Sequence, residues 1–94
     1  MPKNNLHVSY DLIKPDKNYE KVIAKVKELG TWAKIHYSYW YVNSTKTASE
    51  AVDFLKPALD SNDKVYVVDA TNNAAAWNTL PDNVAEYIKD QWTK

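Results

Sequence analysis

Two aspartates stand at the ends of predicted strands, where a carboxylate could do chemistry. Asp11 follows an alternation of apolar and polar residues in LHVSYDLIK (6–14), the pattern of a half-buried strand, and Asp69 ends the apolar run KVYVVDA (64–70). Hard divalent cations such as Mg²⁺ and Mn²⁺ prefer carboxylate oxygens, so Asp11 is a candidate metal ligand. It could equally accept hydrogen bonds from the turn at 13–16, and we interpret Asp69 as a turn residue of that kind.

The remaining candidates for catalysis have no partner at a recognisable spacing. His7 and His36 lie in predicted strands without the further ligands of a zinc site or the orienting group of a general base. His7 shares a strand face with Asp11 and could line a site there, although a partly buried structural histidine is the simpler interpretation. Ser38 lacks the glycines of a nucleophile elbow, and we interpret it as a bend.

The charge balance restricts the possible partners. Twelve lysines offset twelve acidic residues, and the chain has neither arginine nor cysteine. Without cysteine there is no disulfide, thiolate zinc site or cysteine nucleophile. Arginine is the usual bidentate phosphate ligand, so a neutral chain without it gives RNA only weak support as a partner, with Lys14 and Lys17 as the candidate phosphate contacts near Asp11. No signal-peptide pattern or membrane span is apparent, which predicts a cytoplasmic protein with no membrane partner.

The elements that must position these residues follow from hydrophobic periodicity and turn residues. The run 31–44 favours strand throughout but would extend roughly 46 Å in a domain of about 32 Å, so it must break, most simply at Tyr37–Ser38. Helix caps are available at Asp16 or Asn18 for the first helix, and Gly30 fits a left-handed position after its last turn. The predicted elements are a strand within 6–14, a helix over 18–29, strands over 32–36 and 39–43, a helix capped by Ser44, Thr45 or Thr47, a strand over 64–70, and a helix opened by Pro81.

This order predicts an α+β protein with the ferredoxin-like βαββαβ fold, a four-stranded antiparallel sheet with an added C-terminal helix. We expect one domain over 1–94, with a core at 5–71 and a C-terminal extension at 72–94. In this topology the first and last strands are antiparallel, so Asp11 and Asp69 lie at opposite ends of the sheet, about 20 Å apart. A partner carboxylate for Asp11 would therefore have to come from a second copy of the chain.

Aromatic residues are more numerous than a monomer of this size usually buries. Four tryptophans and seven tyrosines occur in 94 residues, and one sheet face would stay open beside two helices packed on the other. We therefore predict a homodimer and interpret Tyr37, Tyr39, Trp40 and Tyr41 as its interface. The same rings could instead stack on single-stranded bases. The sequence leaves open whether the last helix packs on its own subunit or on the other one.

Two short motifs, separated in the sequence by one predicted helix, carry a family resemblance. The stretches VSYDL (8–12) and AKIHYSYWYV (33–42) resemble the superfamily of small ferredoxin-like proteins that includes the CRISPR-associated endoribonuclease of spacer acquisition and virulence-associated protein D, and are most similar to its SinR-like branch. The resemblance covers about the first 70 residues. It implies a homodimer in which Asp11 faces its symmetry mate, and the two carboxylates share Mg²⁺ or Mn²⁺ to cleave a phosphodiester.

Two functions remain open on the sequence. The first is a metal-dependent endoribonuclease with Asp11 as the catalytic and metal-binding residue. The second is a non-catalytic dimer that serves as an interaction or scaffold module, which the neutral charge and absent arginine favour.

Overall fold

A computed structural model describes residues 3–12, 15–36, 38–60 and 63–93. It is an α+β structure with a four-stranded antiparallel sheet and, in those residues, three α-helices, as the class prediction required. The sheet has the order β2-β3-β1-β4, which is compatible with the ferredoxin-like prediction. The elements are β1 (Asn4–Asp11), α1 (Pro15–Glu28), β2 (Thr31–His36), β3 (Tyr39–Ser44), α2 (Ala48–Leu55), a 3-10 turn (Lys56–Ala58), β4 (Lys64–Asp69) and α3 (Asp82–Gln91).

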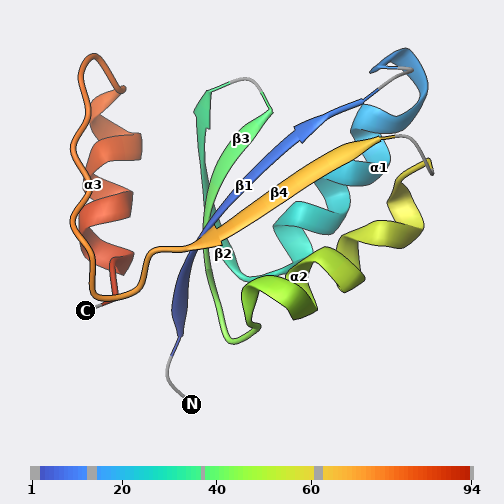
Figure 1. Cartoon of the computed structure of the whole chain (residues 1–94). Helices are drawn as coiled ribbons and strands as arrows, with labels where there is room; N and C mark the ends of the chain where they lie inside the picture. The colour runs from blue at the N-terminus through green and yellow to red at the C-terminus, as the bar shows by residue number, and fades with distance from the viewer. Residues whose placement is uncertain (1–2, 13–14, 37, 61–62, 94) are drawn as a thin grey trace.

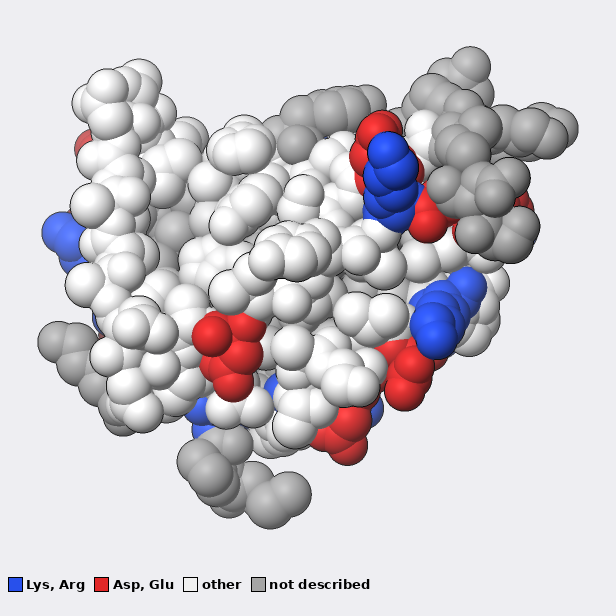
Figure 2. All heavy atoms as spheres, in the orientation of Figure 1, with Lys and Arg blue, Asp and Glu red and all other residues white. Residues whose placement is uncertain are grey.

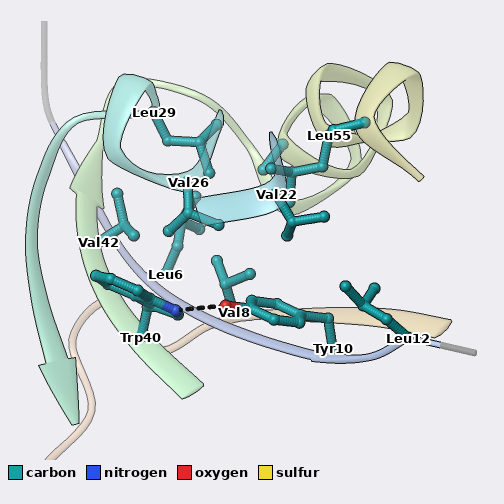
Figure 3. Close-up of a cluster of buried hydrophobic side chains, with 12 residues drawn as sticks. Leu6, Val8, Tyr10, Leu12, Val22, Val26, Leu29, Trp40, Val42 and Leu55 are labelled. Carbon is teal, nitrogen blue, oxygen red and sulfur yellow. Dashed lines mark hydrogen bonds between the residues drawn. The ribbon is translucent and has the colours of Figure 1, made fainter. Parts of the chain in front are cut away.

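The main core lies between one face of the sheet and the helices α1 and α2 (Figure 1). The alternation in β1 sends Leu6, Val8 and Tyr10 to this side, and Leu12 follows them just after the strand; each is at most 6% exposed. Figure 3 shows them packed beneath residues of both helices, with the indole Nε1 of Trp40 donating a hydrogen bond of 3.0 Å to the Tyr10 hydroxyl. That bond satisfies two buried polar groups, so both aromatic rings can be buried without an unpaired donor.

The other face of the sheet is partly covered by α3, on the opposite side from α1 and α2 (Figure 1). Ala33 of β2 and Tyr41 of β3 form a second buried cluster with Ile88 of α3. Val84, Tyr87 and Trp92 pack around it, so the helix turns an apolar stripe toward the sheet. In this structure of one chain, the last helix packs on its own sheet.

Two buried asparagines attach the end of α3 to the sheet. The side chain of Asn5 bonds both backbone groups of Thr93: its Nδ2 donates to the carbonyl oxygen at 2.6 Å, and its Oδ1 accepts from the amide at 2.8 Å. Asn43 Nδ2 donates to the Gln91 carbonyl and to Thr93 Oγ1, both at 2.9 Å, and the Tyr41 hydroxyl donates to Asn5 Oδ1 at 3.0 Å. This network fixes where the C-terminal segment crosses β1 and β3.

The predicted turns and caps are partly confirmed. Ser38 bends the chain between β2 and β3 with a φ of 61°, and Thr47 is the cap of α2, in a reciprocal capping box with Glu50. The predicted start of the first helix at 18 is wrong, because α1 begins at Pro15, whose fixed φ suits a first helical position. Asp16 therefore lies inside α1 and is not its N-cap.

Gly30 is required for a different reason from the predicted one. Its φ is not positive, so it does not form a left-handed helix cap. Instead, a Cβ at this position would overlap the backbone carbonyl oxygen of Asn43, where the chain leaving α1 passes β3. The glycine allows this close backbone approach.

None of the helices in the described part of the chain is both long and apolar enough to cross a membrane.

Candidate functional site

Asp11 lies at the end of β1 and its side chain is exposed, so the carboxylate stays hydrated and no free energy is lost to its burial. The register of β1 with β4 places Lys64 directly opposite, and directly opposed residues point to the same sheet face. Ser9 lies on that face two residues before Asp11. A shallow pocket of about 400 Å³ opens here, lined by Ser9, Tyr10, Asp11, Lys64, Val65 and Tyr66.

Lys64 is the functional candidate that the sequence reasoning missed. The sheet register places this lysine directly opposite Asp11, and its ammonium group could contact an anionic ligand there. The signal was present in the sequence, because antiparallel first and last strands place the start of 64–70 beside the end of the first strand. The predicted cations are not tested: Lys14 is outside the described residues, and Lys17 belongs to α1 with its side chain undescribed.

The sheet face around Asp11 is left uncovered by α3, which packs over β2 and β3. Tyr66 is 70% exposed and Val68 is 39% exposed, and both lie on this face of the edge strand β4. Figure 2 shows that the surface over the middle of the sheet is largely uncharged, with charged side chains around it. An exposed apolar area beside Asp11 could accept another protein surface.

Asp69 is a turn residue at the opposite end of β4, as predicted. Its Oδ1 accepts hydrogen bonds from the backbone amide of Thr71 at 3.0 Å and from the Thr71 hydroxyl at 2.5 Å. In the sheet it lies opposite Leu6, five residues from Asp11 along β1. One chain therefore cannot bring these two carboxylates to one metal ion.

The described residues do not assemble a metal site around Asp11 on one chain. Among the described residues there is no group of three or more histidine, cysteine, aspartate or glutamate side chains placed to hold a metal. Asp11 provides one carboxylate, and the lysine opposite it opposes cation binding. Two carboxylates together with phosphate oxygens and water would satisfy Mg²⁺ or Mn²⁺, so the donor set becomes suitable only if a second Asp11 is added.

The aromatic run predicted as a dimer interface lies mostly inside the chain. Trp40 is 2% exposed in the main core, and Tyr41 is fully buried beneath α3, where it stacks on Trp92 with ring centroids 5.6 Å apart. Tyr39 is half-buried beside His7, and Tyr37 is outside the described residues. In this structure the chain's own helices bury the rings of Trp40 and Tyr41, leaving neither exposed to a second copy.

His7 has an aromatic environment on the same sheet face as Asp11. Its ring lies 5.9 Å from Tyr39, 6.0 Å from Tyr41 and 5.8 Å from Trp92, and its Nδ1 is 3.3 Å from the Tyr39 hydroxyl. Burial lowers the pKa of His7 from its ordinary value of 6.5. His7 is therefore a neutral, partly buried histidine at neutral pH.

The lowered pKa of His7 makes the stability of the fold depend on pH. Below pH 6.5 the unfolded chain takes up a proton at His7 more readily than the folded chain, so the free energy of unfolding falls as the pH drops through that value. We expect His7→Gln to remove the contribution of this histidine to the fall in the free energy of unfolding. Urea unfolding of both proteins between about pH 5 and pH 8 measures it, and a variant with the same pH dependence as the parent would contradict this environment for His7.

Comparison with known proteins finds no family model, no curated protein and no solved structure that matches this chain.

Proposed function

We propose that this chain is a ferredoxin-like homodimer that cleaves RNA phosphodiesters with Mg²⁺ or Mn²⁺, through Asp11 of both copies. The second copy would cover the half of the sheet face that α3 leaves open, with Tyr66 and Val68 at the contact. Such a contact would bring the two β1 ends together. The observation that carries the proposal is the exposed Asp11 carboxylate on that open face, with the cationic Lys64 opposite it in the sheet.

Each residue has a defined role in this proposal. The two Asp11 carboxylates would hold the cation, which supplies a Lewis acid for the phosphate and a water of lowered pKa. Lys64 would place a positive charge against the phosphate oxygens and offset the charge that the carboxylates bring. The resemblance of VSYDL and AKIHYSYWYV to the CRISPR-associated and virulence-protein-D endoribonucleases supports the same assignment.

A non-catalytic dimeric interaction or scaffold module is the second candidate. It is favoured by a specific observation: among the described residues Asp11 belongs to no group of three or more potential metal-binding side chains, and the whole sequence has no arginine to contact phosphate. This module would use the same open sheet face, so dimerisation alone does not distinguish the two functions.

Cleavage assays distinguish them. Labelled single-stranded RNA, duplex RNA and DNA are incubated with the purified protein in Mg²⁺, in Mn²⁺ or with EDTA, and its mass in solution is measured by light scattering. We expect a dimer that cleaves single-stranded RNA only with a divalent cation. A monomer at micromolar concentration would contradict the dimer, and a dimer without cleavage in either cation would leave the scaffold module as the function.

A further inference from the structure

A second pocket lies between the sheet and the C-terminal extension, separate from the pocket at Asp11. It has a volume of about 350 Å³, within the usual range of small-molecule sites. Residues of β1, β2 and β3 form one side, and the segment before α3 together with α3 and Trp92 forms the other. Its lining includes His7, His36, Tyr39, Trp77, Ile88 and Trp92.

The lining of this pocket is aromatic and aliphatic, with two histidines and a tyrosine as its polar residues. None of the lining residues is a lysine, aspartate or glutamate, and burial keeps His7 neutral at neutral pH. No carboxylate or ammonium group in the lining would offset the charge of a charged ligand, so the pocket suits a neutral ligand. Trp77 is 37% exposed, which leaves part of its ring accessible at the surface.

Polar groups lie at defined places in this aromatic lining. The rings of His7 and His36 lie 5.9 Å and 5.0 Å from the Tyr39 ring. Tyr39 bonds His7 at Nδ1, so a hydrogen bond from His7 to a ligand would use Nε2. The pocket therefore combines stacking surfaces with hydrogen-bonding groups, which are the two requirements for binding a flat heteroaromatic ring by its face and its edge.

We propose that this pocket binds a neutral planar heteroaromatic ring, a nucleobase, between the tryptophans of the extension and the histidine–tyrosine group of the sheet. The base could belong to a free nucleoside or to single-stranded RNA. His7 and Asp11 are four residues apart on one face of β1, about 13 Å, so one short RNA strand could reach both. The RNA source rests on the proposed function, whereas the base pocket itself needs only one chain.

Tryptophan indole signals test the pocket directly. The four tryptophans give four indole N–H peaks in a ¹⁵N–¹H correlation spectrum, assigned with single Trp→Phe variants. Adenosine, guanosine, cytidine, uridine and a short single-stranded oligoribonucleotide are then titrated in separately. We expect saturable shifts of the Trp77 and Trp92 peaks, with those of Trp32 and Trp40 unchanged, because Trp32 and Trp40 pack against each other and Trp40 lies in the main core.

A matched pair of substitutions controls for the exposed tryptophan itself. Trp77→Leu is expected to weaken binding about tenfold or more, because stacking supplies much of the affinity for a base. Trp32→Leu should leave binding unchanged, since Trp32 has a similar exposed fraction, 39%, outside the pocket. Equal losses in both variants, or no saturable shift at Trp77 with any probe up to millimolar concentration, would overturn the proposal.

A free nucleoside and single-stranded RNA, as sources of the base, give different titration results. The same experiments separate the base pocket from the proposed RNA cleavage. Tighter binding of the oligonucleotide than of nucleosides supports RNA as the source, whereas binding of nucleosides alone overturns the RNA source and supports a nucleoside pocket. Asp11→Asn should retain the nucleoside shifts at Trp77, because Asp11 does not line this pocket. Retained binding without any RNA cleavage by the parent protein would contradict the proposed function and leave the base pocket supported.

Discussion

Replacing Asp11 by asparagine is expected to reduce metal-dependent RNA cleavage by at least about 100-fold. The substitution keeps the size of the side chain and removes its negative charge, so two copies would lose both carboxylates from the cation site. Metal-assisted stabilisation of transition-state charge amounts to several kcal/mol, and each 1.36 kcal/mol corresponds to a factor of ten in rate. Initial cleavage rates at saturating Mn²⁺ measure this loss.

The fold should not change in this variant, because Asp11 is exposed and is not part of the core. The matched control is Asp53→Asn, which removes an exposed carboxylate of α2 whose ion pair with Lys56, at 3.4 Å, lies on the surface. Cleavage by Asp53→Asn is expected to equal that of the parent. Unchanged cleavage in Asp11→Asn, with circular dichroism matching the parent, would contradict the assignment of Asp11.

Replacing Asn5 by alanine is expected to lower the free energy of unfolding by about 3 kcal/mol. Asn5 is fully buried, and its side chain holds the amide and carbonyl of Thr93 and accepts from the Tyr41 hydroxyl. Alanine would leave these groups without their partner, and each buried unsatisfied group costs about 1–3 kcal/mol. The end of α3 would lose its attachment to β1, and the cover over Tyr41 and Ala33 would weaken with it.

The neighbouring asparagine provides the control. Asn4 is only partly buried, and its Nδ2 donates one bond of 2.9 Å to the carbonyl of Lys46. We therefore expect Asn4→Ala to cost about 1 kcal/mol or less in urea unfolding. Similar losses for Asn4→Ala and Asn5→Ala would show that the buried network does not anchor the C-terminal segment as described.

Features that depend on local sequence were predictable. The two-residue alternation in 6–14 predicted the buried side of β1, and the excessive length of 31–44 predicted the bend at Ser38. Thr47, with Glu50 three residues later, is a standard cap signal. Such features depend on periodicity and turn chemistry within a few residues. The separation of Asp11 from Asp69 followed from topology alone, and the sheet register confirms it.

Features that depend on contacts between distant segments were not predictable in the same way. The need for Gly30 comes from the Asn43 carbonyl on another element, which no local pattern reveals. The burial of Tyr41 depends on α3 folding back over the sheet, held by Asn5 and Asn43. Without that long-range contact, the aromatic run appeared to need a second subunit to cover it.

The separation between the two Asp11 carboxylates in a dimer is the measurement that tests the central claim most directly. It can be obtained from a crystal structure of the full chain grown with Mn²⁺. We expect the carboxylate groups within about 8 Å of each other, close enough for one cation with oxygen distances of 2.3–2.6 Å or less to join them. A dimer that places the two Asp11 side chains farther apart, with Mn²⁺ bound elsewhere or not at all, would contradict the account.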